Sequence, residues 1–355
     1  MKSIDKTKPV LVTGANGYLA SWLVKTLLED GLTVHAAIRN PAIKEKYAHL
    51  DKIAASSQGS IRYFAADLLT EGSYAEAMAG CELVYHTASP FTLSIKDAQK
   101  QLIDPAGNGT ATVLNQANKT ESVKRVLVTS SCAAIYTDAI DTVNAPNSKI
   151  TEEIWNATSS LDYQPYSYSK TLAEKKAWEI CNGQDRWDLV TINPSFVMGP
   201  ALNPKTATSE SVSVLKQMGD GSMKMGVPKM GVGVVDVRDV ASAHYQAGFN
   251  PKAQGRYITS GHSTDFLEMA LTLQSKFGDK YPLPKKALPK WLVMLVGPLT
   301  NPGFSRKMLR NNINVSWDAD NSKIQNELGI KFRPLKETME ESFDTLISSG
   351  IIKAK

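Results

Sequence analysis

The sequence predicts an α/β fold built on a doubly wound parallel sheet, and three observations lead to this prediction. Over the first 200 residues, short apolar segments rich in β-branched residues alternate with helical patterns. The first of these segments, residues 10–13, ends in a glycine-rich turn that opens a helix. Polar residues follow the ends of later strands, where a parallel sheet presents its ligand-binding edge. The sequence therefore favours a Rossmann-type sheet with a smaller, interleaved C-terminal lobe.

Composition and charge exclude several classes of protein. The chain has 355 residues, of which 42% are hydrophobic and 21% charged, as in ordinary globular proteins. Its formal charge of +5 is small and dispersed, so we expect no nucleic-acid partner. Cys81, Cys132 and Cys181 are widely separated, which argues against a disulfide framework and against a metal site. A reducing, cytoplasmic location is expected.

No segment is predicted to enter a membrane. The first eight residues are charged and run directly into a strand, which leaves no room for a signal peptide. The most apolar later run, residues 291–296, stops at Gly297-Pro298, far short of the ~20 residues that span a bilayer. We therefore expect no membrane partner, and a monomer or homodimer.

The glycine turn indicates a dinucleotide site. Gly14 permits the tight turn, Gly17 lets the backbone approach a pyrophosphate, and Ala20 allows close packing of the helix. The N-terminus of that helix offers free N–H groups and a positive dipole end to the phosphates. The same turn adds Asn16, Tyr18 and Leu19 to the expected cofactor contacts.

The end of the second strand, residues 33–38, indicates which cofactor is bound. An NAD-specific fold usually has an acidic residue here, but this chain has Arg39, followed by Lys44 and Lys46. A guanidinium suits a phosphate better than a bare ribose, so Arg39 predicts NADP(H). A surface arginine without a ligand is the alternative interpretation.

The other strand ends supply further expected cofactor contacts. The third strand, residues 61–66, ends at Asp67 and Leu68, which are expected to border the adenine. A helix N-cap is an equally good role for Asp67. The fourth, fifth and sixth strands place seven more residues at this edge: Thr87, Ala88, Ser89, Thr129, Pro194, Ser195 and Val197.

Groups with catalytic chemistry are expected at the same edge. Ser130 and Ser131 directly follow the fifth strand, residues 125–129. Tyr166 and Lys170 are four residues apart at the start of a helix, so they share one helical face. The lysine is therefore placed to make the phenol a stronger acid. Taken alone, this spacing describes a half-buried aromatic residue beside a solvated lysine equally well.

Three motifs in this order resemble the extended short-chain dehydrogenase/reductase superfamily: Gly14-x-x-Gly17-x-x-Ala20, Ser131, and Tyr166-x-x-x-Lys170. Further motifs resemble its branch of dihydroflavonol reductases, cinnamoyl-CoA reductases and fungal methylglyoxal and aldehyde reductases. These motifs are His86-Thr87-Ala88-Ser89-Pro90-Phe91, Asn193-Pro194-Ser195, Val237-Arg238-Asp239-Val240-Ala241 and Phe332-Arg333-Pro334-Leu335. The resemblance covers nearly the whole chain.

The resemblance implies a role for each catalytic group. Ser131 would polarise a substrate carbonyl, Tyr166 would donate a proton, and Lys170 would assist the tyrosine and hold the nicotinamide ribose. Ser131 is favoured over Ser130 because the catalytic serine of the superfamily is the second of a Thr-Ser-Ser run. Arg39 and Lys46 match positions that bind the 2′-phosphate of NADPH.

The resemblance also bears on the substrate. Tyr136 stands where dihydroflavonol reductases have an asparagine that binds the flavonoid ring, which argues against such a substrate. An apolar substrate pocket is expected instead, lined by Phe91, Tyr136, Tyr163 and Phe196, although any one of them can equally be ordinary core. Asp239 is expected to be structural, with Arg238 as its partner, and His86 is expected to pack beneath the cofactor.

The leading interpretation is an NADPH-dependent carbonyl reductase, which converts a small-molecule aldehyde or ketone to an alcohol and can act in reverse as an alcohol dehydrogenase. Two alternatives are a nucleotide-sugar epimerase or dehydratase with the same catalytic residues, and a non-catalytic NADP-sensing protein. Residues 1–200 are expected to form the cofactor domain, with returns from about 232–260. Residues 201–231 and 261–355 are expected to form mainly the substrate lobe.

Overall fold

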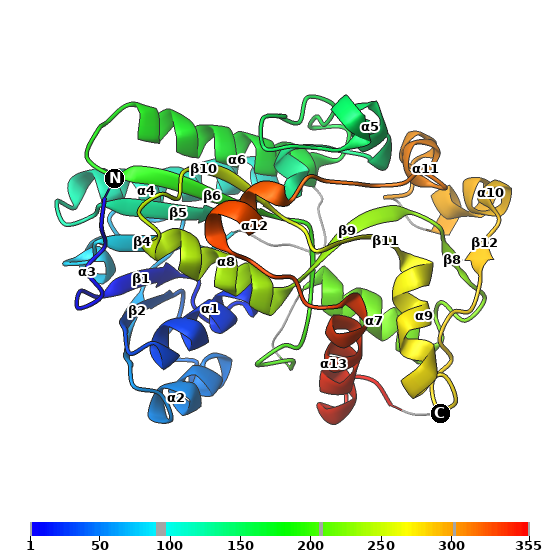
Figure 1. Cartoon of the computed structure of the whole chain (residues 1–355), viewed down its shortest axis with the longest axis horizontal. Helices are drawn as coiled ribbons and strands as arrows, with labels where there is room; N and C mark the ends of the chain where they lie inside the picture. Colours follow the sequence, from blue (N-terminus) through cyan, green and yellow to red (C-terminus); the bar gives the residue numbers. More distant parts are fainter. Residues whose placement is uncertain (1, 90–96, 206–208, 301–302, 354–355) are drawn as a thin grey trace.

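The structure is a computed structural model that describes residues 2–89, 97–205, 209–300 and 303–353. Its centre is a seven-stranded sheet, all parallel, with the strand order β10-β6-β5-β4-β1-β2-β3 (Figure 1). The strands are β1 (Val10–Thr13), β2 (Thr33–Ile38), β3 (Ser60–Ala65), β4 (Leu83–His86), β5 (Arg125–Thr129), β6 (Asp188–Pro194) and β10 (Gly255–Thr259). The predicted fold class is confirmed.

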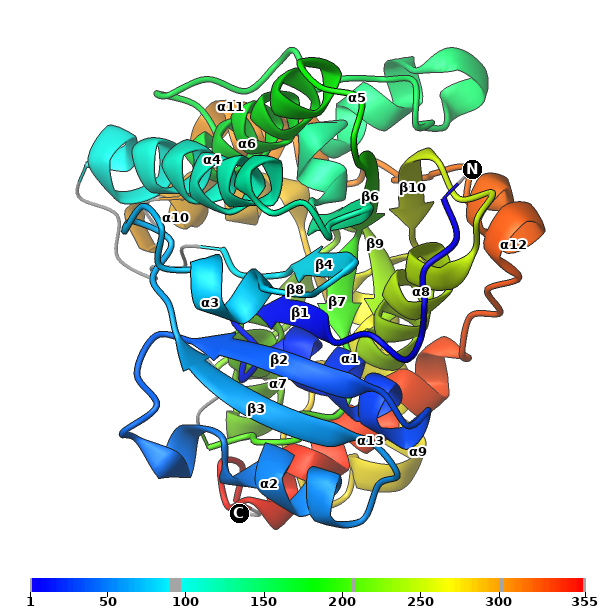
Figure 2. The same cartoon turned by 90° about the vertical axis from the view of Figure 1, so that its left-hand side faces the viewer.

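Helices cover both faces of this sheet, because alternate residues of each strand point to opposite sides. In β1, Val10 and Val12 pack in one apolar cluster and Leu11 packs in the other. Helices α1 (Tyr18–Glu29) and α8 (Val237–Phe249) cover the first side, and α4 (Asp104–Lys119) and α6 (Pro165–Asn182) cover the second (Figure 2). Shorter helices at the periphery are α2 (Ala48–Ala55), α3 (Ala75–Met78), α5 (Ala139–Asn144) and α12 (Ser322–Leu328).

A smaller lobe continues from the carboxyl end of β6. Its sheet joins β11 (His262–Asp265), β9 (Gly231–Asp236) and β7 (Phe196–Met198), and β8 (Val227–Pro228) pairs with β12 (Ala287–Leu288). Its helices are α7 (Glu210–Asp220), α9 (Phe266–Phe277), α10 (Lys290–Thr300), α11 (Arg306–Asn312) and α13 (Leu335–Ser348). The chain leaves this lobe after β9 to form α8 and β10 in the large sheet. The boundaries assigned to two domains stay a prediction.

Strand β7 has no clear signal in the sequence. Its three residues lie between Pro194 and Gly199-Pro200, a context that is typical of a loop. They nevertheless pair in parallel with β9, whose register places Phe196 opposite Val234. A strand this short is specified by its partner strand rather than by its own pattern.

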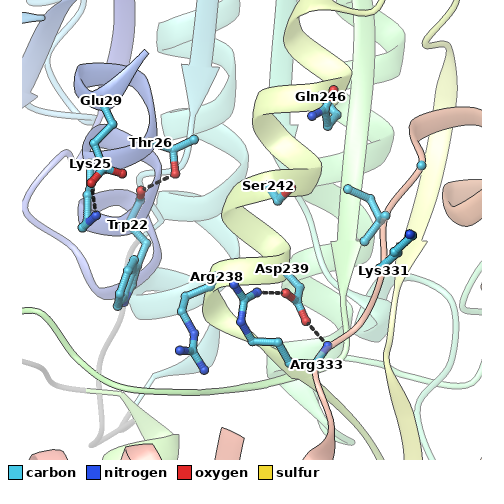
Figure 3. A pocket seen from close by; sticks show the side chains of 12 residues that line it. Trp22, Lys25, Thr26, Glu29, Arg238, Asp239, Ser242, Gln246, Lys331 and Arg333 are labelled. Atoms are coloured by element: carbon cyan, nitrogen blue, oxygen red, sulfur yellow. Dashed lines mark hydrogen bonds and ion pairs between the residues drawn. The ribbon is translucent and has the colours of Figure 1, made fainter. Parts of the chain in front are cut away.

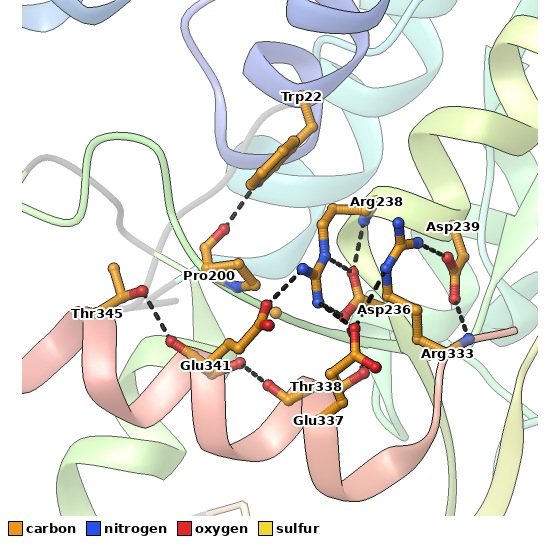
Figure 4. Close-up of polar contacts among 12 residues, drawn as sticks. Trp22, Pro200, Asp236, Arg238, Asp239, Arg333, Glu337, Thr338, Glu341 and Thr345 are labelled. Carbon is orange, nitrogen blue, oxygen red and sulfur yellow. Dashed lines mark hydrogen bonds and ion pairs between the residues drawn. The ribbon is translucent and has the colours of Figure 1, made fainter.

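Ion pairs on α8 attach the C-terminal segment to the sheet (Figure 4). The carboxylate of Asp239 accepts a hydrogen bond from the backbone N–H of Arg333 at 2.8 Å and pairs with its guanidinium. Arg238 instead pairs with Asp236 at 2.7 Å and with Glu341. The expectation that Arg238 is the partner of Asp239 is therefore wrong. Neighbouring helical residues point about 100° apart, so Arg238 reaches α13 while Asp239 faces the segment before it.

A cleft of about 480 Å³ lies between α1, α8 and residues 329–333 (Figure 3). Most charges on its wall are neutralised within the protein, since Lys25 pairs with Glu29 and Arg333 with Asp239.

Within the described residues, no helix is both long and apolar enough to cross a bilayer.

Candidate active site

The glycine turn lies at the carboxyl edge of the sheet, between β1 and the end of β4. Gly14 has a φ of 62°, and a Cβ atom there would lie 3.0 Å from the Cβ of Ala88. The N–H of Gly17 donates to the carbonyl of Gly14 at 2.8 Å, which closes the turn before α1 begins. Only glycine combines this left-handed conformation with such a close neighbour. The turn therefore brings the first N–H groups of α1 to the edge where a phosphate can bind.

Ser131 and Ser130 lie side by side after β5, but their hydroxyl groups have different partners. Ser130 donates its proton to the buried carboxylate of Glu174. The Oγ atom of Ser131 accepts from the N–H of Ala133 at 3.1 Å, and its proton is donated to no other residue in the described structure. The Ser131 hydroxyl thus keeps a donor for a ligand.

Tyr166 and Lys170 occupy the first two turns of α6. The Nζ atom of Lys170 lies 5.9 Å from the centre of the Tyr166 ring and donates to the Oγ atom of Ser89 at 3.0 Å. The Tyr166 side chain is exposed and lines the same cleft as Lys170 and Ser131. A serine hydroxyl, a phenol and an ammonium group thus converge on one space, which is a donor set suited to a developing alkoxide.

Glu174 extends this helical face into the core. Its carboxylate is fully buried and accepts from the Nδ2 atom of Asn193 at 2.7 Å and from the Nε atom of Arg256 at 2.6 Å. Asn193 also donates to the backbone carbonyl of Ser131 at 3.2 Å. The catalytic candidates therefore rest on a buried polar network that was not predicted. The i, i+4, i+8 spacing of Tyr166, Lys170 and Glu174 was the available signal.

A cleft of about 860 Å³ runs from the glycine turn past β5 to β7. It gathers fifteen of the residues predicted for the site: Asn16, Gly17, Tyr18, Leu19, Thr87, Ser89, Thr129, Ser131, Tyr136, Tyr166, Lys170, Pro194, Ser195, Phe196 and Val197. The Oγ atom of Ser195 is buried in this wall and has no hydrogen-bond partner among the described residues. A buried hydroxyl without a partner is costly, so this atom fits a bound polar ligand such as a dinucleotide.

Several predicted cofactor residues lie outside the lining of this cleft: Gly14, Arg39, Lys46, Asp67, Leu68 and Ala88. The Arg39 side chain is 81% exposed, and its Nε atom lies 3.5 Å from the carboxylate of Asp67. Asp67 also accepts from the N–H of Leu69 at 2.8 Å, so it caps a turn and not a helix. Leu68 packs close to Gly109 of α4. Arg39 and Lys46 are thus exposed cations on the segment that follows β2.

The aromatic residues predicted for the substrate pocket are placed differently from one another. Tyr136 and Phe196 line the cleft. The ring of Tyr136 packs against that of Trp317, with 5.6 Å between the ring centres. Tyr163 lies outside the lining, because its hydroxyl donates to Asp138 at 2.6 Å. Phe91 falls outside the described residues.

His86 and His244 are buried beneath the site. The Nδ1 atom of His86 lies 3.0 Å from the Oγ1 atom of Thr13. Burial lowers the pKa of His86 to about 3, and the charge of Lys170 acts in the same direction. Burial likewise lowers the pKa of His244 to about 4. Both rings are therefore neutral at pH 7 and pack under the edge of the sheet. No group of three His, Cys, Asp or Glu side chains in the described ranges could hold a metal ion.

A family comparison agrees with this geometry. The model of the "NAD dependent epimerase/dehydratase family" matches residues 10–258, which is more than half of the chain. The chain belongs to this family. It is thus a member of the extended short-chain dehydrogenase/reductase superfamily, as its motifs predicted.

Several relatives of this chain are reductases by name, and the chain is accordingly an NAD(P)-dependent oxidoreductase. Tetraketide alpha-pyrone reductase 1 of Arabidopsis thaliana is 34% identical over 98% of each chain. Cinnamoyl-CoA reductase CAD2 of Medicago truncatula is 38% identical over 81% of this chain and 86% of its own. A crystal structure of Gre2 from Candida albicans in complex with NADPH matches with a TM-score of 0.75 and 28% identity, over 96% and 99% of the two chains.

Proposed function

We propose that the protein is an NADPH-dependent carbonyl reductase, which reduces an aldehyde or ketone to an alcohol and can also run in reverse. The observation that carries this proposal is the convergence of Ser131, Tyr166 and Lys170 on a cleft that begins at the glycine turn. The names of the relatives and the NADPH complex of Gre2 add support.

In this mechanism the bound nicotinamide supplies the hydride, and the protein manages the charge on oxygen. Ser131 donates a hydrogen bond to the substrate carbonyl, and this bond strengthens as negative charge builds. Tyr166 donates its proton to that oxygen. Lys170 lies on the same helical face, 5.9 Å from the centre of the Tyr166 ring, and it is placed to bind the ribose through its remaining donors.

The wall of the cleft limits the class of substrate. Tyr136 and Phe196 offer aromatic surface beside the catalytic groups, and Tyr136 packs on Trp317. Such a wall favours apolar or aromatic carbonyl compounds. With Tyr136 in place of the asparagine found in dihydroflavonol reductases, we expect dihydroflavonols to be poor substrates.

A spectrophotometric assay with NADPH and with NADH tests this function. We expect nicotinamide absorbance to fall with aliphatic aldehydes, α-dicarbonyls or aryl ketones. Absence of turnover with every carbonyl class, despite tight NADPH binding, would favour a sensing protein. A preparation that retains stoichiometric NAD(H) and converts nucleotide sugars would favour an epimerase.

Arg39 is expected to determine the preference for NADPH. We predict that Arg39→Asp raises the Kd for NADPH by at least about tenfold, because a charge-assisted contact with the 2′-phosphate is lost. The Kd for NADH should change much less. Fluorescence titration with both cofactors measures this, and Arg62→Asp, on an exposed position of β3, controls for the change in net charge. Equal effects of Arg39→Asp on both cofactors would contradict the assignment.

A further inference from the structure

Helix α10 lies at the outer end of the lobe (Figure 1). It carries an apolar stripe on its solvent side. Its buried residues Val293 and Gly297 pack against Leu309 of α11. On the opposite side, Trp291, Leu295 and Leu299 are 69%, 63% and 85% exposed. Their i, i+4, i+8 spacing joins them into one continuous surface. Large apolar side chains that gather in water in this way mark an interaction site.

The chain segment that contains α10 is strongly basic. Residues 280–317 contain seven Lys and Arg and neither Asp nor Glu, whereas the whole chain has a formal charge of only +5. The remainder of the chain is therefore net negative. Lys285 and Lys286 directly precede β12 and α10, and Arg306 and Arg310 lie on α11, which packs against α10.

These four basic side chains are available to an external partner. All four are exposed, and none forms an ion pair or a side-chain hydrogen bond with another residue in the part of the chain that the structure describes. Lys307 differs from them, because its Nζ atom lies over the ring of Tyr163, 3.8 Å from the ring centre. Four basic side chains without a partner in the described structure thus lie on the segments that flank α10 in the chain, two before it and two on α11.

We propose that this surface docks the protein on an anionic lipid membrane. We call it the α10 face, and it consists of Trp291, Leu295, Leu299, Lys285, Lys286, Arg306 and Arg310. A helix with an apolar stripe and basic flanks lies in the plane of the bilayer interface, where Trp and Leu enter the boundary of the acyl chains and Lys and Arg meet lipid phosphates. An interfacial helix does not span the bilayer, so the length of α10 does not oppose this role.

Other occupants fit the α10 face less well. A second copy of this chain would bring two positively charged surfaces together without a carboxylate from residues 280–317 to offset them. A nucleic acid would use the cations but not a stripe of Trp and Leu. An anionic lipid surface satisfies both the apolar and the charged part. The expectation of no membrane partner rested on segments that span a bilayer or are cleaved, and surface docking needs neither.

Co-sedimentation with vesicles tests the proposal on the full chain. We expect binding to phosphatidylcholine vesicles that contain phosphatidylserine, weak binding to phosphatidylcholine alone, and weaker binding at high salt. The double variant Leu295→Gln, Leu299→Gln should lower the partition coefficient by at least about tenfold, since two apolar side chains that would enter the bilayer interface are lost. Lys285→Gln with Lys286→Gln should lower it and reduce its salt dependence.

Leu69→Gln is the matched control, because Leu69 is as exposed as Leu295, at 63%, but lies far from α10 in the sequence on the loop after β3. This variant should bind vesicles like the unchanged protein, and all variants should keep the same circular dichroism spectrum. Failure to bind anionic vesicles would overturn the proposal. A loss of vesicle binding in Leu69→Gln as large as in the double leucine variant would also overturn it. Dissociation of a dimer by Leu295→Gln, Leu299→Gln, without any vesicle binding, would assign the α10 face to self-association instead.

Discussion

Replacing Tyr166 with Phe is expected to lower the turnover of a carbonyl substrate by at least about 10³-fold. The hydroxyl group that donates the proton is removed, while the ring that lines the cleft remains. Binding of NADPH should change by less than about threefold, since Lys170 and the glycine turn are intact. Single-turnover kinetics and fluorescence titration separate the two effects.

Tyr168→Phe is the matched control for this variant. It removes a hydroxyl from the same helix, but Tyr168 does not line the cleft in the described structure. Its turnover should stay within about twofold of the unchanged protein. Retention of turnover in Tyr166→Phe would disprove the proposed proton donor, and a large loss in Tyr168→Phe would indicate a general defect of α6.

Glu174→Gln is expected to lower the free energy of unfolding by about 3–5 kcal/mol. The amide keeps the size of the side chain but leaves the buried guanidinium of Arg256 without a counter-charge. The Cζ atom of Arg256 also lies 4.0 Å from the centre of the Trp155 ring, which partly supports the remaining cation. Urea denaturation followed by circular dichroism measures the loss.

Glu179→Gln provides the comparison for this stability change. Glu179 is on the same helix and pairs with Lys176 at 2.8 Å, but its side chain is largely in solvent. Exposed pairs of this kind contribute little to stability, so we expect a change below about 0.5 kcal/mol. Similar losses in both variants would show that burial of Glu174 has no special consequence.

The parts of the molecule that were predicted correctly have local signals in the sequence. The strands β1, β2 and β5 have the bounds that their apolar β-branched runs predicted. A strand that is buried on both faces has a nearly continuous apolar sequence, so its ends can be recognised. The glycine turn and the Tyr166-x-x-x-Lys170 spacing are also local. Right-handed crossovers then bring every strand end to one edge, which is why so many of the predicted residues line one cleft.

The parts that were missed depend on contacts between distant segments. Glu174 and Arg256 are 82 residues apart in the sequence, so no periodic pattern links them. Asp239 pairs with Arg333, and Arg238 pairs with Asp236 and Glu341. The packing of the C-terminal segment on α8 determines these pairs, and no local pattern predicts it. Tyr163 looks like a pocket residue by type, but Asp138 holds its hydroxyl away from the cleft. Residue type alone does not decide such choices.

The position of β10 has a consequence for chimeric enzymes. This strand lies beside β6 in the large sheet, although residues 195–254 separate the two in the chain. Residues 195–254 hold α8 and only the first part of the lobe, and the rest of the lobe follows β10. The chain therefore enters the lobe at one junction after Pro194 and at another after Thr259. A graft that takes everything after the first junction from another reductase would replace Arg256 and expose β6 as an edge strand wherever the new β10 fits poorly. Exchange of specificity between relatives requires both crossover points to be matched.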